Sequence, residues 1–440
     1  MLKLIAYQFR YTKDKWLGTL PILLVSSLIV GTSLIGIASA SKTAITSIQL
    51  FQMLIFFGGV TLFLLISNII RFLIDIFKDD YQLWTVLGAS RSQLSILVGG
   101  QFFVIALFSS LVGTLLSILV VDKYYSFLQS FVGKRDLPDI IVSVDIKTFI
   151  LSLFIVPIIA GVGAYLYSRK ILKQGVLSND VTHHRNVFAV IIKIVLGIVV
   201  FLLWISCLSY LFSDASSKSF SDTLQQTSAI LLLLLVHLLI IQIISPYVQM
   251  FFLKYVVRIS SKTKYSVVLG KWNILYKPSY LKSLQSSVTM GATLISGFLL
   301  YIQNMYIGTQ VNSVQETKFS FLAYMSAPIV IILSNIISIT ILSSNQDREE
   351  IVQLKTFGVS NQQLLMIRVS EALIQSLLTF VISMIFNIII LFTVNYGVHL
   401  LGRRLLTIYS VWLPSLMISG LLFVLVLGTK MLRVMRIKNI

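Results

Sequence analysis

The chain has 440 residues, of which 57% are hydrophobic and only 12% are charged, and its formal net charge at pH 7 is +19. A soluble domain carries about 25% charged residues, so this composition excludes a water-exposed globular protein of this size. The apolar residues form continuous runs, several of them reaching the roughly 20 residues that an α-helix needs to cross a bilayer. Because backbone polar groups must be hydrogen-bonded inside lipid, we predict an all-α polytopic membrane protein.

The apolar runs predict about ten transmembrane helices. The first run has no small-residue cleavage site after it, so we expect it to be retained as a span. Most Lys and Arg residues between spans lie in segments that are cytoplasmic when the N-terminus is inside. The positive-inside rule therefore predicts a multi-pass plasma-membrane protein with both termini cytoplasmic. In chain order, the spans cover residues 17–38, 50–77, 93–121, 146–167, 187–212, 226–252, 281–307, 320–345, 364–394 and 405–430.

Two cytoplasmic segments, one in each half of the chain, carry the same pattern. KDDYQLWTVLGASRSQL begins at Lys78, between the second and third spans, and REEIVQLKTFGVSNQQL begins at Arg348, between the eighth and ninth. The two align without a gap at a shift of 270 residues, from Lys78 to Arg348. This duplication predicts a parallel repeat. Its parts are two four-helix units at residues 1–175 and 261–440, joined by two helices in residues 176–260.

Each repeated segment is predicted to form a short amphipathic helix at the cytoplasmic surface. A pair of acids opens the segment, where the helix dipole favours negative charge. Gly88 or Gly358 then ends the helix at a position that tolerates a positive φ, and Ser90 or Ser360 caps the helix that enters the membrane. One such helix would be an ordinary cytoplasmic loop, but two copies at matching positions favour a docking element.

These segments resemble the FtsX-like permease family, the MacB type of ABC-transporter membrane subunit. The family pattern is an acid-rich start, a G-A/V-S-x-x-Q-L run and an apolar helix with a glutamate near its start. The run stands at residues 88–94 and 358–364, and the glutamate is Glu371 in the second half, where the first half has Gln101. Ten spans with two such units are similar to the bacitracin- and lantibiotic-resistance permeases. Their large extracellular domain is replaced here by a short loop at about 308–319.

The resemblance implies that the repeated segments are coupling helices, which dock on a separate cytoplasmic ABC ATPase. Because one chain carries two such helices, we expect two copies of the ATPase. No G-x-x-x-x-G-K-[ST] loop occurs in the chain, so we expect ATPase activity in the partner and no bound cofactor here. The coupling residues that the resemblance assigns are Asp79, Asp80, Leu83, Leu87 and Gly88 in the first unit, and Glu349, Glu350, Leu354, Phe357 and Gly358 in the second.

Two polar residues within predicted spans are further candidates. Glu371 is a functional candidate because a charge within the bilayer is costly. The alternative is that it lies near the interface and pairs with Arg368, one turn earlier. We expect His237 to bond a neighbouring helix, because no acid accompanies it in a proton relay.

Other kinds of site and partner are not expected. The basic surplus predicts attraction to membrane lipids rather than to nucleic acid. The histidines have no Cys, Asp or Glu at ligand spacing, so no metal site is expected, and no arrangement of catalytic residues stands out.

The sequence thus predicts the permease subunit of an ABC transporter that exports an amphipathic peptide or lipid, or removes it from the membrane. The alternative is an FtsX-like subunit for transmembrane signalling or mechanotransmission, which moves no cargo and meets another membrane or sensor protein. A secondary transporter ranks last, because the repeat is parallel rather than inverted and the expected midplane charges are lacking.

Overall fold

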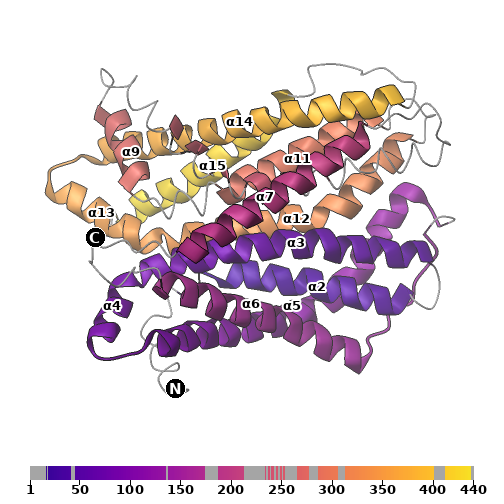
Figure 1. Ribbon diagram of the computed structural model, residues 1–440, viewed down its shortest axis with the longest axis horizontal. Helices are drawn as coiled ribbons and strands as arrows, with labels where there is room; N and C mark the ends of the chain where they lie inside the picture. Colours follow the sequence, from indigo (N-terminus) through magenta and orange to yellow (C-terminus); the bar gives the residue numbers. More distant parts are fainter. Residues whose placement is uncertain are drawn as a thin grey trace. The chain divides into compact units, whose positions relative to one another are not determined.

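The structure, a computed structural model, describes residues 16, 18–40, 45–134, 137–173, 187–212, 265–276, 286–305, 313–400 and 412–437, with scattered positions between 233 and 252. Every element in this part of the chain is an α-helix, as predicted (Figure 1). The helices in the first half are α2 (Leu20–Ala40), α3 (Ile45–Ile76), α4 (Lys78–Val86), α5 (Arg91–Val132), α6 (Ile146–Lys173) and α7 (Val187–Leu211). Those in the second half are α9 (Tyr265–Tyr276), α11 (Ser286–Met305), α12 (Ser313–Leu342), α13 (Ser344–Thr356), α14 (Asn361–Leu400) and α15 (Trp412–Ile437).

The chain is a multi-pass membrane protein. Within the described residues, six helices are long and apolar enough to cross a bilayer: α2, α3, α5, α6, α12 and α14. The predicted fifth, seventh and tenth spans coincide with α7, α11 and α15, whose apolar stretches are shorter. The predicted sixth span, at 226–252, lies largely outside the described residues.

Two helices extend well beyond the predicted spans. α5 has 42 residues and α14 has 40. At 1.5 Å per residue each is about 60 Å long, twice the thickness of the hydrocarbon core. The predicted loop at 122–145 therefore begins as helix, because neither Gly nor Pro interrupts the sequence before Gly133, where φ is +91°.

The helices form two compact units. Unit 1 comprises Met1–Val181 and Lys318–Asn345, and unit 2 comprises Thr182–Thr317 and Gln346–Ile440. Most of α12 thus packs with helices of the first half. The backbone N–H of Ile22 donates to Ser338 Oγ (3.1 Å), and the hydroxyls of Tyr124 and Ser326 are 3.0 Å apart. The two packing units therefore do not coincide with the two halves of the chain. The predicted repeat units at 1–175 and 261–440 rest on the sequence alone and stay a prediction.

In unit 1, α2 and α5 approach closely through small residues. A Cβ at Gly113 would lie 2.0 Å from Ser27 Oγ, and one at Gly31 would lie 2.5 Å from Ser117 Oγ. Small residues let helix backbones come together in lipid, where no hydrophobic force drives association. α5 also packs along α6, so α2, α5 and α6 form one tightly packed group (Figure 1). Its central helix, α5, directly follows α4 in the chain.

In unit 2, α14 packs against α9, α11 and α15. The Asn387 amide of α14 donates to Ser296 of α11 and Ser415 of α15, both at 2.7 Å. Such buried polar bonds hold membrane helices in register. At the other end of α14, α9, α13 and the end of α15 gather around its N-terminal turns (Figure 1).

Candidate coupling helices and a buried charge cluster

The first candidate coupling helix is α4, which follows α3 after a single residue, Phe77. Gly88 ends it with φ +93°. The Gly88 N–H donates to Thr85 O (3.0 Å) and the Ala89 N–H donates to Trp84 O (2.9 Å), which is the Schellman arrangement. Ser90 then caps α5 in a reciprocal capping box with Gln93. The glycine and serine predictions are confirmed.

The second candidate, α13, ends in the same way. Gly358 has φ +80°, its N–H donates to Lys355 O (2.9 Å), and the Val359 N–H donates to Leu354 O (3.1 Å). Ser360 Oγ accepts from the Gln363 N–H (3.3 Å), and Gln363 Oε1 accepts from the Ser360 N–H (2.9 Å). The repeat is therefore conformational as well as sequential.

The start of α13 differs from the prediction. The acid pair lies in the first turn of α4, as expected, but α13 already begins at Ser344, so Glu349 and Glu350 lie in its middle. The prediction that the acids open this helix is wrong, because the preceding polar residues contain no Gly or Pro to prevent helix formation.

Both helices present apolar side chains to the surface at their C-terminal ends. Leu87 is 79% exposed and Phe357 is 85% exposed, and Leu83 is exposed beside Leu87. Leu354, also predicted to couple, instead packs inward with Ile351 and Leu364. Asp79 and Glu349 were also predicted to couple, but their side chains are not among those that the structure describes. We call the exposed set, Leu83, Val86, Leu87, Val352 and Phe357, the apolar tips.

The inner face of α4 rests on an aromatic cluster, formed by Trp16, Phe77, Tyr81 and Phe102. The Trp16 ring stacks on Phe77 with centroids 5.4 Å apart and meets Phe102 edge-on at 5.3 Å. Tyr81 lies 5.9 Å from Phe77. Burial, with a smaller contribution from Asp80, raises the pKa of Tyr81 far above its ordinary value, so its phenol stays neutral.

The corresponding region of unit 2 holds a charge cluster, formed by Asn273, Glu350, Arg368, Glu371 and Lys430. Its centre is the Glu371 carboxylate, which is only 1% exposed. Arg368 Nη1 lies 2.9 Å from both carboxylate oxygens, and Lys430 Nζ of α15 lies 2.5 Å from Oε2. The Asn273 amide of α9 donates to Oε1 at 2.8 Å. Every part of this buried anion is thus hydrogen-bonded, as low polarity requires.

Glu350 joins this cluster to α13. Its carboxylate accepts a hydrogen bond from Asn273 and lies 3.4 Å from Arg368 Nη2. Asn273 and Arg368 therefore each bridge the two carboxylates, one on α13 and the other on α14. Two formal positive and two formal negative charges balance in the cluster, and the charged groups come from α13, α14 and α15.

The sequence anticipated only part of this cluster. It suggested the contact between Glu371 and Arg368, which is present, and it named Glu350 for a different reason. Asn273 and Lys430 were missed, because they lie 98 and 59 residues from Glu371. A residue-by-residue comparison of the two halves offers a signal, since Lys430 falls on Ala160 at the shift of 270.

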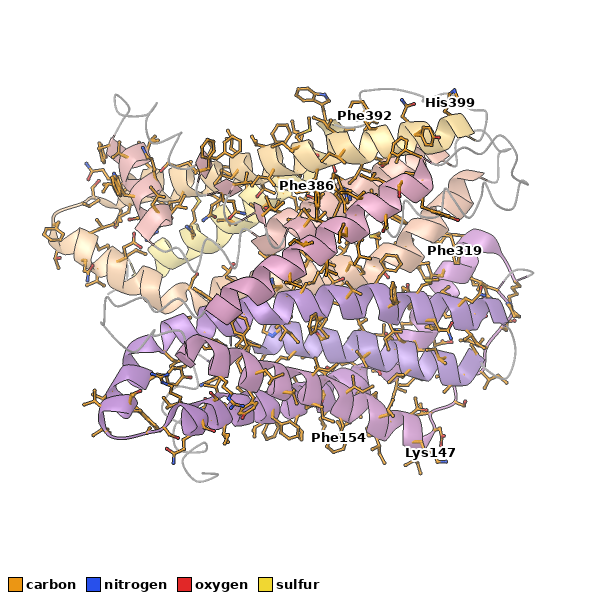
Figure 2. All side chains as sticks on the ribbon, in the orientation of Figure 1. Lys147, Phe154, Phe319, Phe386, Phe392 and His399 are labelled. Carbon is orange, nitrogen blue, oxygen red and sulfur yellow. The ribbon has the colours of Figure 1, made fainter. Side chains whose placement is uncertain are left out.

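His237 is buried, and its Nδ1 lies 2.8 Å from the Leu233 carbonyl oxygen in the same segment. Its ring meets Trp204 of α7 and Phe386 of α14 edge-on, at 6.2 and 5.9 Å. Phe386 is labelled on α14 in Figure 2. Within the described residues, His237 therefore contacts other helices through its ring rather than through the expected hydrogen bond.

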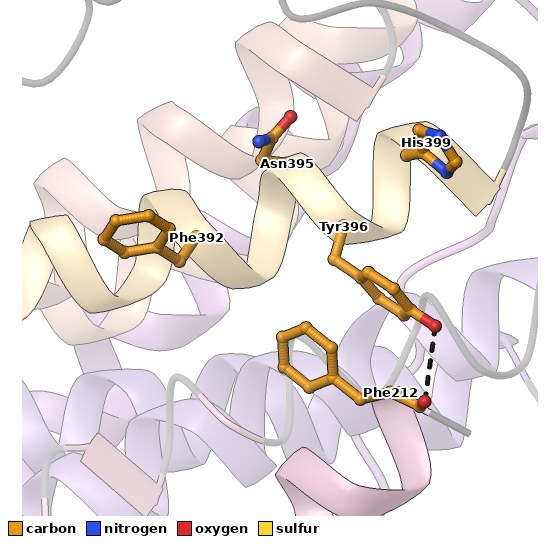
Figure 3. A pocket seen from close by; sticks show the side chains of 5 residues that line it. All are labelled: Phe212, Phe392, Asn395, Tyr396 and His399. Carbon is orange, nitrogen blue, oxygen red and sulfur yellow. Dashed lines mark hydrogen bonds between the residues drawn. The ribbon is translucent and has the colours of Figure 1, made fainter. Parts of the chain in front are cut away.

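An aromatic hollow of about 400 Å³ lies between the end of α7 and the last turns of α14 (Figure 3). Its lining residues are Phe212, Phe392, Asn395, Tyr396 and His399. The Tyr396 hydroxyl donates to the Phe212 carbonyl oxygen at 3.3 Å, and the two rings are 4.3 Å apart. The hollow combines ring faces with an amide and an imidazole, so it suits a ligand that is partly apolar and partly polar.

Comparison with known proteins bears on the first half. Residues 52–176 match the family model described as FtsX-like permease C-terminal. The match begins within α3 and ends just beyond α6, so it contains α4, α5 and most of α3. A search of curated proteins gave no match. FtsX-like permeases are membrane transport components rather than enzymes, and they generally partner with a cytoplasmic ATPase. The match supports a membrane permease component of an ABC-type system.

Proposed function

We propose that the chain is the membrane-spanning subunit of an ABC transporter, and that α4 and α13 are the helices on which a separate cytoplasmic ATPase acts. The observation that carries this proposal is the pair of identically capped helices with exposed apolar tips. Large apolar side chains at an exposed helix end suit a protein contact, and such anchors contribute most of an interface's energy. The family match over α4 supports the same role.

The local structure suggests how a push on these helices reaches the membrane. A Schellman turn and a capping box join α4 to α5 with no flexible linker, and a single residue joins it to α3. The close packing of α5 on α2 then spreads a displacement of α4 into unit 1. Hydrolysis in the ATPase would in this way tilt spans rather than only bend a loop.

For the cargo we propose an amphipathic peptide or a lipid, exported or removed from the outer leaflet. The aromatic hollow supports this class, because its rings suit an apolar chain while Asn395 and His399 offer polar partners. In the predicted topology it lies at the external end of α14, where such a molecule enters from the membrane. Both termini are then in the cytoplasm.

The docking proposal is tested with the variant pair Leu87→Asp and Phe357→Asp in the chain copurified with its ATPase. Both side chains are exposed, so the fold should be retained. Docking of the ATPase would then have to bury a charge where the wild-type chain buries an apolar side chain. We expect binding of the ATPase to weaken by at least about thirtyfold in the double variant, as for an interface anchor worth roughly 2 kcal/mol.

The matched control is Ile141→Asp, which changes an equally exposed apolar residue (84%) on the predicted external side. It should leave ATPase binding unchanged. Wild-type binding by the double tip variant would contradict docking through α4 and α13.

Transport and signalling are separated by reconstituting the complex into vesicles with a fluorescent phospholipid analogue or a cationic amphipathic peptide as probe. ATP-dependent movement of either probe supports the permease. ATP-driven conformational change with both probes stationary would instead favour the signalling alternative.

A further inference from the structure

The two candidate coupling helices end alike but are held differently. At the shift of 270 residues, Arg368, Glu371 and Lys430 fall on Val98, Gln101 and Ala160, so the first half lacks three of the four charges. In the first half, the inner face of α4 rests on the aromatic cluster. In the second half, Glu350 of α13 enters the charge cluster.

We propose that the charge cluster is an electrostatic clamp that makes α13 and α15 move as one body. This inference rests on the proposed function, because it assigns a positioning role to residues behind a coupling helix. The clamp has two arms: Glu350 attaches α13, and Lys430 attaches α15. Both arms hold the Arg368–Glu371 pair, which belongs to α14.

The geometry gives this clamp a direction. α13 continues into α14 through the short turn at residues 357–360. α15 lies some 50 residues further along the chain, since α14 ends at Leu400 and α15 begins at Trp412. Within the described residues, the printed polar contacts lead from α13 to Lys430 of α15 through Glu350, then Arg368 or Asn273, then Glu371. The Glu350 side chain is 18% exposed, whereas the other three charged groups are almost fully buried, so the α13 arm lies at the rim.

Stability alone does not explain why charges are used here. Buried ion pairs are often no more stabilising than apolar residues of the same volume, since desolvation offsets their attraction. The aromatic cluster shows that this chain holds the other coupling helix with apolar side chains. What ion pairs add is directionality: their bonds fix both the angle and the register of the helices that they join.

The test removes both arms and keeps the centre. The double variant Glu350→Met with Lys430→Met deletes one negative and one positive charge and leaves the Arg368–Glu371 pair intact. Spin labels at Gln353→Cys on α13 and Gly428→Cys on α15 report their separation in a Cys207→Ser background. Both sites are exposed, and nothing lies within 4 Å of a Cβ at Gly428. The distance is measured by pulsed electron resonance in the complex with the ATPase, without nucleotide and after trapping with ATP and vanadate.

With the clamp intact, the label distance should be the same in both states. In the double-methionine variant, trapping should shift it by on the order of 5 Å, about one helical turn. Lys430→Arg keeps the charge and should behave as wild type, whereas a purely space-filling role would not distinguish arginine from methionine in this way. The exposed pair Lys134–Asp139, changed to Gln and Asn, is the matched control for loss of an ion pair.

Two results would overturn the clamp: a wild-type distance that changes on trapping, or a double-methionine variant whose distance stays constant. If that variant does not fold, Glu350→Gln replaces it, since glutamine keeps the bond from Asn273 and loses the attraction to Arg368. A smaller shift is then expected, and none would contradict the proposal. If the wild-type chain binds no ATPase at all, the proposed function fails before the clamp is tested.

Discussion

At the scale of single residues, the glycines that end α4 and α13 are the most constrained positions of the repeat. Both have a φ that L-residues rarely adopt, +93° at Gly88 and +80° at Gly358. Nothing lies within 4 Å of a Cβ at either position, so a substitution there is opposed by the backbone alone. The glycines set the sharp turn that presents the apolar tips.

We predict that Gly88→Ala and Gly358→Ala each destabilise the end of the corresponding coupling helix by about 1–2 kcal/mol, the cost of a left-handed conformation with a Cβ. Hydrogen exchange over residues 78–90 and 344–360 measures this. Gly59→Ala is the control, because it also has open space but an ordinary helical φ, and it should be neutral or stabilising. Unchanged exchange at both helix ends would contradict the assigned strain.

These two positions also show what the sequence can reveal at this scale. The caps were predictable because each of their hydrogen bonds joins residues at most five apart. Two partners of Glu371 were not predictable, because Lys430 and Asn273 come from other helices and only folding brings them to the carboxylate. A lone acid in an apolar run indicates that partners are needed without saying which residues supply them.

At the scale of elements, α4 and α13 share an ending and differ in support. Some helix boundaries could be predicted from the sequence and others could not. The glycine turns were correct, but the beginning of α13 and the extension of α5 to Val132 were not, because no Gly or Pro marks them in the sequence. Where local stop signals exist the elements are predictable, and where they do not, helix continues by default.

The difference in support predicts that a lesion in the aromatic cluster loosens α4 alone. Trp16→Ala removes a fully buried ring and should destabilise the α4 region by about 3–5 kcal/mol, the usual cost of an aromatic cavity. Hydrogen exchange should rise in α4 and stay unchanged in α13. Trp272→Ala, at an exposed tryptophan on α9, is the control with little expected effect. Equal loosening of both helices would show that their supports are not independent.

At the scale of the whole molecule, one chain carries both proposed coupling helices. A transporter whose permease had one such helix would need two permease chains for two ATPase subunits. Under the proposed function, the duplication would supply both docking sites in one chain. The repeat in the sequence predicted two coupling helices per chain. It did not predict that α12 packs in unit 1, because that packing depends on contacts with α2 and α5, which are far away in the chain.

We therefore predict a complex of one permease chain with two ATPase subunits. Native mass spectrometry should give the 49.4 kDa chain plus two copies of its partner. Because the ATPase pair is held at two linked sites, a lesion at one tip leaves the second site to act at high effective concentration. Leu87→Asp or Phe357→Asp alone should thus weaken binding far less than both together. Two permease chains per ATPase pair, or complete loss of binding from either single change, would contradict this stoichiometry.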